Sequence, residues 1–318
     1  MKEKIDIAAC PDKDFVMPTG VMMYSICVNN LDVDIDFHII IDESVTKDDQ
    51  QDLMDSICMF EGKTVLFYYF KNRSGIQFPI ICESHLTLAA YYRLYITDVL
   101  PSSINKVLYL DGDVIIRRSL KELWDMDLSG YALAAVPDMR VGTIDRYDVL
   151  GYSKSLGYFN SGVLLINLAY WRQHQVTKLF NEFIRNRSEA ILHYDQDVLN
   201  YIFREQKMTL PIKYNFQHGF LWKNPQYDWS KYGEEVIEAR KDPVIVHFTG
   251  NKPWRLSYDP NPFRSTFLKY QKMTRWKGFT IDLRPYPMKV RHFFGNILRR
   301  MRIRPRVQSR FVTIAPVD

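Results

Sequence analysis

The chain has 318 residues, of which 47% are hydrophobic and 25% are charged, and its formal net charge is +5. This length allows one large domain, with or without an appendage, and the composition excludes a chain that is disordered over most of its length. No apolar run is long enough for a helix that crosses a bilayer, and the N-terminal residues do not resemble a signal peptide.

Short apolar segments alternate with helix-like segments over the first hundred residues. Residues 5–9, 37–41 and 64–70 predict strands. Residues 46–60, with Thr46 as N-cap, and residues 86–100, which stop before Pro101, predict helices. Apolar strands that alternate with helices predict an α/β sheet covered on both faces, so ligands should lie beyond the carboxyl ends of the strands.

The most informative segment is residues 106–116, K-V-L-Y-L-D-G-D-V-I-I, which predicts a buried strand that carries two carboxylates. Residues i and i+2 of a strand point to the same side, so Asp111 and Asp113 can reach one divalent cation. Gly112 leaves room for a ligand near the backbone.

Two other interpretations of this acidic pair stay open. Acids at a strand end often only face solvent. Haloacid-dehalogenase-type phosphotransferases also place D-x-D after an apolar strand, but usually near the chain start and with a downstream acidic cluster. Here more than a hundred residues precede the motif and no convincing cluster of that type follows, so this interpretation ranks well below metal binding by a different class of enzyme.

The second half of the chain continues the alternation. Residues 131–136, 159–168 and 244–248 predict strands, and residues 171–186 and 195–203 predict helices. His247, in the last of these strands, is either a core histidine or a third metal ligand beside the two acids. Gly250 and Lys252 suit a diphosphate, because glycine opens the backbone and lysine supplies a point charge, although Lys252 can equally be a solvated loop residue.

The pattern changes after about residue 262. Nine of the 42 basic residues lie between Leu283 and Val317 with no acid among them, which leaves 33 basic and 37 acidic residues elsewhere. Apolar residues recur on one helical face from Val290 to Met301 with arginines beside them. This predicts a helix that lies on an anionic membrane, or one that docks on the protein's own surface. No nucleic-acid-binding module is recognisable, so no nucleic-acid partner is expected.

The cysteines indicate the compartment. Cys10, Cys27, Cys58 and Cys82 form no C-x-x-C pair, which argues against a disulfide framework and favours a reducing environment. We therefore expect the protein in the cytoplasm, either free or peripheral on the inner face of the membrane.

Taken together, these motifs resemble glycosyltransferase family 8, especially the bacterial lipopolysaccharide and lipooligosaccharide galactosyl- and glucosyltransferases. The segments that carry the resemblance, in the family's order, are P-D-K-D-F at 11–15, H-L-T-L-A-A-Y-Y-R-L at 85–94, K-V-L-Y-L-D-G-D-V at 106–114, Y-F-N-S-G-V-L-L-I-N-L at 158–168, D-Q-D-V-L-N at 195–200 and H-F-T-G-N-K-P-W at 247–254. The ordered set is specific, whereas no single member is.

The resemblance implies a glycosyltransferase A-type fold, with a Rossmann-like mixed sheet flanked by helices over residues 1–262 and a basic helical extension over residues 263–318. It implies a retaining transfer of galactose or glucose from UDP-galactose or UDP-glucose, with Mn²⁺ or Mg²⁺, to a glycan or lipid-linked acceptor such as lipopolysaccharide. Two alternatives are a transferase that acts on a protein or glycogen-like acceptor and a catalytically idle sugar-nucleotide binding protein.

The resemblance also assigns residues to roles. It places the metal on Asp111, Asp113 and His247, the nucleoside on Asp12, Asp14 and Phe15, the diphosphate on Gly250 and Lys252, the donor sugar and catalysis on Arg93, Asn160, Asp195 and Gln196, and the acceptor near His85 and Asp138. Two features depart from the family. Phe15 stands where an aromatic residue with a hydroxyl is frequent, and the segment from Gly250 to Lys252 is one residue shorter than in the galactosyltransferases, which affects the reach of the lysine.

Overall fold

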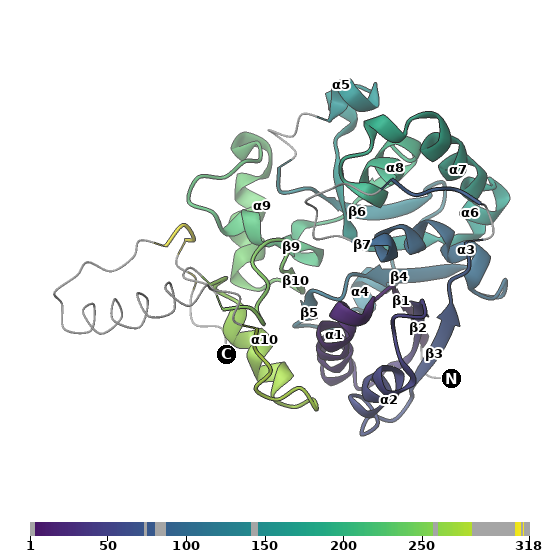
Figure 1. Ribbon diagram of the computed structural model, residues 1–318. Coiled ribbons are helices and arrows are strands. Elements are labelled where there is room, and N and C mark those ends of the chain that lie inside the picture. The colour runs from purple at the N-terminus through teal and green to yellow at the C-terminus, as the bar shows by residue number, and fades with distance from the viewer. Residues whose placement is uncertain are drawn as a thin grey trace, which may run out of the picture.

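The computed structural model describes residues 4–72, 75–79, 87–140, 146–256, 260–281, 309–312 and 314 (Figure 1). A seven-stranded sheet has the order β3-β2-β1-β4-β7-β6-β8, and β7 is its one antiparallel member among the described strands. Its strands are β1 (Lys4–Ala9), β2 (Asp34–Ile41), β3 (Lys63–Tyr69), β4 (Lys106–Leu110), β6 (Leu133–Pro137), β7 (Phe159–Asn167) and β8 (Lys207–Thr209). A three-stranded sheet has the order β5-β10-β9 and is made of β5 (Val114–Ile116), β10 (Ile245–His247) and β9 (Phe216–Gln217).

Helices flank the larger sheet, so the predicted mixed α/β class is confirmed. Figure 1 shows α1 (Val16–Val28) and α2 (Lys47–Asp55) near β1, β2 and β3, and α6 (Leu168–Gln173), α7 (Val176–Asn186) and α8 (Tyr194–Ile202) near β7 and β6. The remaining α-helices are α3 (Ile96–Val99), α4 (Lys121–Trp124), α5 (Tyr147–Leu150), α9 (Trp229–Lys241) and α10 (Arg264–Gln271). Every described helix is too short or too polar to span a lipid bilayer.

The central strands form the core because their side chains are apolar on both faces. Ile7 of β1, Leu108 of β4 and Leu164 of β7 are fully buried. Burial of one such side chain contributes about 1.5–3 kcal/mol to stability, so these strands hold the sheet rigid beneath whatever lies at their ends.

Five of the described α-helices, α1, α4, α5, α9 and α10, have no counterpart in the sequence prediction. In α1, residues 16–27 are all buried, so the helix lacks the polar stripe from which an amphipathic helix is recognised. Pro18 lies in its first turn, where the missing N–H costs no hydrogen bond.

Three predicted elements differ in detail. The single strand expected over residues 106–116, interrupted by two carboxylates, is instead two strands in different sheets, because the chain turns at Asp111–Asp113. The expected helix over residues 86–100 is instead a 3-10 helix, Leu88–Tyr95, followed by α3. The expected helix over residues 171–186 is split between α6 and α7, because Gln175 takes a left-handed conformation with φ 50°.

The helix start at Thr46 is confirmed. Thr46 and Asp49 form a reciprocal capping box at the N-terminus of α2. The predicted helix over residues 290–301 lies outside the described residues, and the division at residue 262 stays a prediction. Residues just beyond that division pack on the body, because Asn29 Nδ2, at the C-cap of α1, donates to Tyr270 Oη of α10 at 3.0 Å.

Candidate active site

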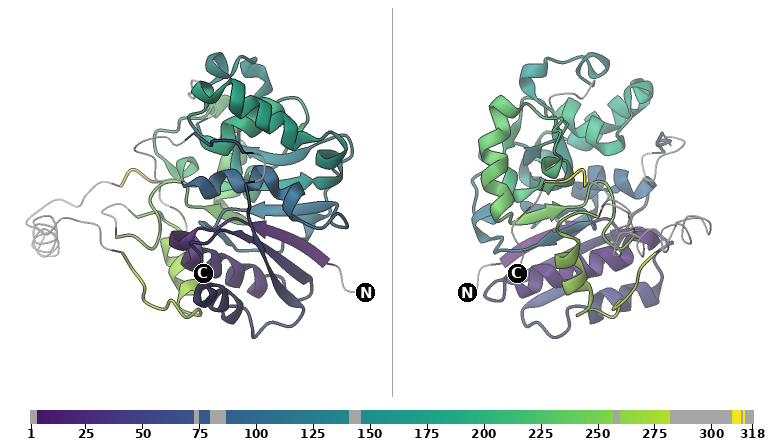
Figure 2. Two further views of the ribbon diagram at one scale, coloured as in Figure 1. Left: turned by 45° about the vertical axis from the view of Figure 1, so that its right-hand side comes forward. Right: turned by 90° about the vertical axis from the view of Figure 1, so that its left-hand side faces the viewer.

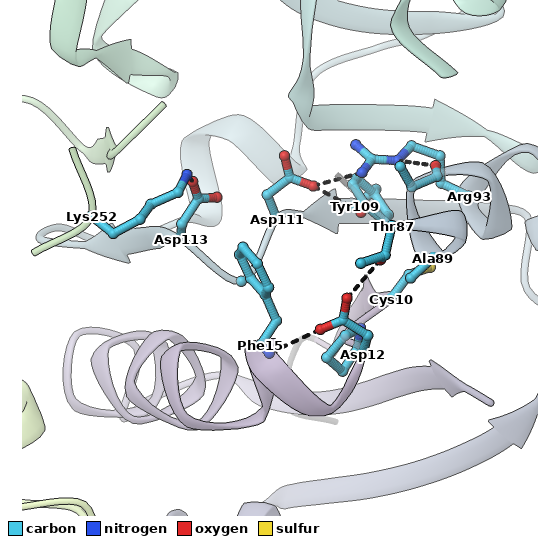
Figure 3. A pocket seen from close by; sticks show the side chains of 13 residues that line it. Cys10, Asp12, Phe15, Thr87, Ala89, Arg93, Tyr109, Asp111, Asp113 and Lys252 are labelled. Atoms are coloured by element: carbon cyan, nitrogen blue, oxygen red, sulfur yellow. Dashed lines mark hydrogen bonds and ion pairs between the residues drawn. The ribbon is translucent and has the colours of Figure 1, made fainter. Parts of the chain in front are cut away.

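The predicted ligand side chains gather at the point in the larger sheet where the strand order reverses. From β1 the chain proceeds to β2 and β3 on one side, whereas β4 pairs with β1 on the other side. The ends of β1 and β4 therefore diverge into a crevice, which is where open α/β sheets bind ligands. Asp12 follows β1 and Asp111 follows β4 at this point, and both line one pocket with Phe15, here called the Phe15 pocket (Figure 3).

The candidate metal cluster is formed by a turn that links the two sheets. Asp111 follows β4, and Asp113 precedes β5, which pairs with β10 so that Val114 lies opposite His247. His247 Nε2 lies 3.3 Å from Asp113 Oδ1 and 3.8 Å from Asp111 Oδ2. One ligand atom from each of the three residues lies within 4.8 Å of the others. Two carboxylates and an imidazole at this spacing fit a divalent cation.

A buried amide orients the imidazole of His247. Asn215 Nδ2 donates to Asn160 Oδ1 at 2.9 Å, so Asn215 Oδ1 is the atom that faces His247 Nδ1, also at 2.9 Å. This contact places the ring proton on Nδ1 and leaves the Nε2 lone pair directed at the carboxylates. Metal-binding histidines commonly have such a partner on the second ring nitrogen.

Replacement of Asn215 tests this orientation. We expect Asn215→Leu to weaken Mn²⁺ binding by about 10–100-fold, because the ring loses the acceptor that sets its tautomer and angle. Isothermal titration with Mn²⁺ in the presence of UDP measures the change. The matched control is Asn30→Leu, a buried amide that bonds to Ile26 O and Leu120 N. Equal losses in the two variants would contradict the orienting role.

The charge of Asp113 is held inside the protein by two basic side chains. Its side chain is 6% exposed, and it contacts Lys252 Nζ and His247 Nε2. Burial opposes ionisation, but Lys252 and His247 outweigh it, so the pKa of Asp113 is lowered. Asp113 is therefore an anion that is ready to bind a cation, and Lys252 lies at the same site.

Arg93 connects the metal cluster to the second half of the site. Its NH2 lies 2.9 Å from Asp111 Oδ1, its Nε lies 3.2 Å from Asp195 Oδ2, and its NH1 donates to Ser161 O at 2.8 Å. The guanidinium also lies 4.3 Å from the ring centroid of Tyr109. Burial lowers the pKa of Arg93, but the carboxylates of Asp111 and Asp195 raise it by more. The net effect is a raised pKa, so the guanidinium stays charged.

Asp195 has a different electrostatic environment from Asp113. It is 3% exposed, and burial raises its pKa to about 6, whereas the charge of Arg93 only partly opposes the shift. Arg93 is shared with Asp111, and the Nε–Oδ2 contact is not aligned as a hydrogen bond. With a pKa of about 6, Asp195 can exchange a proton near neutral pH, unlike Asp113, whose pKa is lowered.

A second pocket adjoins the metal cluster and contains Gln196; it is here called the Gln196 pocket. Gln196 Oε1 accepts from Ser161 N at 3.0 Å, and Gln196 Nε2 donates to Asp138 Oδ2 at 3.3 Å. Asn160 Nδ2 contacts both Asp138 and Gln196. The two pockets share Ala90, Arg93, Asp111, Asp113 and Lys252, so they form adjacent halves of one site.

The Phe15 pocket has a rigid floor. Asp12 Oδ1 accepts from the backbone N–H groups of Asp14 and Phe15, and Asp12 Oδ2 accepts from Thr87 Oγ1 at 2.6 Å. The Phe15 ring packs edge-on against Trp254, with centroids 6.0 Å apart. Figure 3 shows Phe15 between Asp12 on one side and the Asp113–Lys252 pair on the other. The carboxylate of Asp12 thus holds the loop that presents the Phe15 ring.

The structure does not bring every predicted residue into the pockets. Asp14 is exposed and lines neither pocket, and Gly250 lines neither, because it packs against the ring of His218. His85 lies outside the described residues. The predicted roles of these residues stay predictions.

Several site residues were missed from the sequence. Asn215, Gly162 and Ser161 support the cluster, and Met139, Arg140, His193 and Thr249 line the Gln196 pocket. Ser161 and Gly162 lie within the resemblance segment 158–168, so that segment was a usable signal. Nothing local marks Asn215, whose place follows from the parallel pairing of β9 with β10.

Comparison with known proteins agrees with this geometry. A family model described as "Glycosyl transferase family 8" matches residues 6–257, which include both carboxylates and the imidazole of the cluster. The chain belongs to glycosyl transferase family 8. Membership of this glycosyltransferase family supports a sugar-transfer activity, and the Asp111–Asp113–His247 group is the candidate site for its divalent metal.

Relatives of this family 8 chain include bacterial surface-glycan enzymes. General stress protein A of Bacillus subtilis (strain 168) is 29% identical over 280 residues, 86% of this chain and 95% of that protein. Lipopolysaccharide glucosyltransferase WaaO of Escherichia coli (strain K12) is 28% identical over 289 residues, 88% of this chain and 81% of that protein. Lipopolysaccharide 1,3-galactosyltransferase of Salmonella typhimurium (strain LT2) is 26% identical over 282 residues, 86% of this chain and 80% of that protein.

A solved structure shares the fold. The crystal structure of galactosyltransferase LgtC in complex with donor and acceptor sugar analogs superposes with a TM-score of 0.75 at 24% identity. The match covers 90% of this chain and 99% of that one. The predicted glycosyltransferase A-type fold is thereby confirmed for this family 8 chain.

Proposed function

We propose that this chain transfers galactose or glucose from UDP-galactose or UDP-glucose to a hydroxyl of a glycan acceptor, such as lipopolysaccharide or another surface polysaccharide. The observation that carries the proposal is the meeting of the Phe15 and Gln196 pockets at the Asp111–Asp113–His247 cluster. A nucleotide sugar has the same layout, because its diphosphate joins a nucleoside, which carries the aromatic base, to a hexose. The names of the lipopolysaccharide relatives support this class of acceptor.

Each half of the site has a function in this proposal. The uracil lies in the Phe15 pocket against the ring of Phe15, and the hexose lies in the Gln196 pocket. Asp111, Asp113 and His247 hold Mn²⁺ or Mg²⁺, which supplies positive charge where negative charge develops on the leaving diphosphate. Lys252, beside Asp113, adds a second positive charge there.

Reaction with retention of configuration is part of the proposal. Retention requires a protein nucleophile or attack by the acceptor on the face that the leaving group vacates. Gln196 is held by Ser161 N and Asp138, and an amide is a poor nucleophile, so front-face attack is favoured. A diphosphate oxygen then takes the acceptor proton. A covalent glycosyl adduct trapped on the wild-type protein contradicts this route.

A binding and turnover experiment tests the function. UDP-galactose, UDP-glucose and GDP-mannose are screened by thermal shift with and without Mn²⁺. A ligand at 100 times its Kd adds about 2.7 kcal/mol of stability, which raises the melting temperature of a chain this long by roughly 4 °C. We expect this rise for a uridine donor only with Mn²⁺, and hydrolysis of that donor without acceptor. Binding without hydrolysis or transfer supports the idle binding protein instead, and no shift with any donor contradicts the proposal.

We also propose that the basic C-terminal extension contacts an anionic membrane. The nine basic residues between Leu283 and Val317 support this, because each basic side chain near such a surface contributes about 1 kcal/mol. We expect joint replacement of Arg299, Arg300 and Arg302 by glutamine to weaken vesicle binding about 100-fold. Flotation with vesicles of phosphatidylcholine and phosphatidylserine measures this, with pure phosphatidylcholine as control. Unchanged flotation removes the membrane contact from the proposal.

A further inference from the structure

The described end of the C-terminal extension pairs with residues 221–223 in the body of the protein. Lys223 N donates to Arg310 O at 2.9 Å, and Val312 N donates to Leu221 O at 2.8 Å, so Trp222 and Phe311 pair as an antiparallel bridge. Figure 2, right, shows this short yellow segment against a green part of the chain. Residues 309–312 are here called the C-terminal latch.

The latch is fastened by one large buried side chain. Phe311 is 3% exposed, and its ring lies 6.4 Å, centroid to centroid, from the ring of His218. His218 in turn packs edge-on against Trp222, with centroids 5.1 Å apart. A buried phenylalanine adds considerable apolar contact, so the latch is a packed element of the fold.

His218 transmits this packing to the Gln196 pocket. Its Nδ1 lies 2.6 Å from Thr249 Oγ1, and its ring leaves no room for a side chain at Gly250, where a Cβ atom would lie 2.2 Å from Nε2. Burial lowers the pKa of His218 to about 3, so the ring is neutral and packs without a counter-ion. Thr249 lines the pocket and is two residues from His247.

A second contact leads to the pocket from the 3-10 helix His218–Leu221, which contains His218. Gly219 N donates to Met139 Sδ at 3.1 Å, and a Cβ atom at Gly219 would lie 2.3 Å from that sulfur. Met139 lines the Gln196 pocket next to Asp138. Residues 218–221 therefore touch two lining residues, Thr249 and Met139, while the latch covers their other side.

The other described flank of the extension is fastened in the same region. Ile281 N donates to Trp254 O at 2.9 Å, and Leu256 N donates to Ile281 O at 3.0 Å. Trp254 also packs against Phe15. Both flanks of the undescribed residues 282–308 thus pair with backbone that frames the site.

We propose that Phe311 is a positioning residue of the transfer reaction, which acts through His218 to hold Thr249 and Met139 in the wall where the acceptor approaches. This inference rests on the proposed function. Because a reacting group displaced by about 1 Å can lower a rate 100-fold, loosening this wall slows transfer even though Phe311 does not reach the Gln196 pocket. The metal cluster has contacts of its own with Asn215 and Arg93, so UDP binding is expected to stay intact.

The test compares variants of the full chain. We expect Phe311→Ala to lower kcat/KM for the acceptor at least about tenfold, with the Kd for UDP and Mn²⁺ changed less than about twofold. Phe311→Leu refills much of the space and restores kcat/KM to within about threefold. Hydrogen exchange, which is independent of activity, is expected to accelerate in Phe311→Ala for the backbone amides of residues 247–252.

The control is Phe60→Ala, which removes a ring that packs on Tyr24 and lines neither pocket. All assays are run at least 10 °C below each variant's melting temperature. Exchange and kinetics of Phe311→Ala that match the wild type overturn the proposal. If Phe311→Ala and Phe60→Ala lose UDP affinity and activity to the same extent, Phe311 has only a packing role. That result also overturns the proposal. If the wild-type chain has no transfer activity, the proposed function is contradicted instead. In that case, unchanged hydrogen exchange in Phe311→Ala still contradicts the positioning role of Phe311.

Discussion

Replacement Asp113→Asn is expected to lower kcat/KM for sugar transfer at least about 1000-fold, since loss of a metal ligand removes several kcal/mol of charge stabilisation. Asp113 is also the contact of Lys252 Nζ and lies 3.3 Å from His247 Nε2. The variant therefore loses a cation ligand and leaves two basic groups facing an uncharged amide. Initial rates with saturating Mn²⁺ and titration of UDP with and without Mn²⁺ measure both effects.

The control uses a second acidic cluster on the same sheet. Asp6, Asp36 and His38 also have ligand atoms within 4.8 Å of one another, but they lie within β1 and β2, before the ends of the strands. His38 Nε2 lies 2.8 Å from Asp6 Oδ1, and Asp36 pairs with Lys4. We expect Asp6→Asn to leave Mn²⁺-dependent UDP binding unchanged. If instead Asp6→Asn abolishes that binding and Asp113→Asn retains it, the metal binds at the Asp6–Asp36–His38 cluster. That result contradicts the proposed mechanism.

The replacement Gly162→Ala is expected to lower kcat/KM at least about 100-fold by displacing a metal ligand. A Cβ atom at Gly162 would lie 2.2 Å from His247 Cε1 and 2.6 Å from Asp111 Oδ2. The backbone of Gly162 lies outside the left-handed region, so only the lack of space excludes a side chain. Titration with Mn²⁺ and UDP, together with initial rates, measures the loss.

The matched control for this prediction is Gly151→Ala. Gly151 follows α5 in the left-handed conformation, with φ 76° and ψ 40°, and the nearest atoms to an added Cβ lie 3.9 Å away. Alanine there should cost about 1–2 kcal/mol of stability and leave the kinetic constants unchanged. If Gly162→Ala behaves like Gly151→Ala, losing stability but keeping metal affinity, then the close approach at Gly162 does not shape the site.

Much of the fold follows from local pattern. Apolar residues 5–9 and 37–41 predict β1 and β2 because strands buried on both faces need no polar alternation. Residues 64–70 predict β3, which is the half-buried strand at the edge of the sheet. The same rule fails for α1, which is apolar on all sides and so shows no helical period. The D-G-D segment shows a further limit. Residues 106–116 are largely apolar on both sides of the two acids, and nothing in them indicates that the two ends join different sheets.

The sequence by itself determined the α/β class, the carboxylate pair after an apolar strand and the ordered motifs of family 8, because these depend on neighbouring residues and their spacing. Only the tertiary structure decided how the acids meet the imidazole. β10 pairs with β5 and β9, which brings His247 beside Asp113 and Asn215 from positions far apart in the chain. The latch at Phe311 depends in the same way on backbone pairing with residues 221–223. Such long-range pairing is stabilised by contacts of the whole packed core, which no local segment encodes.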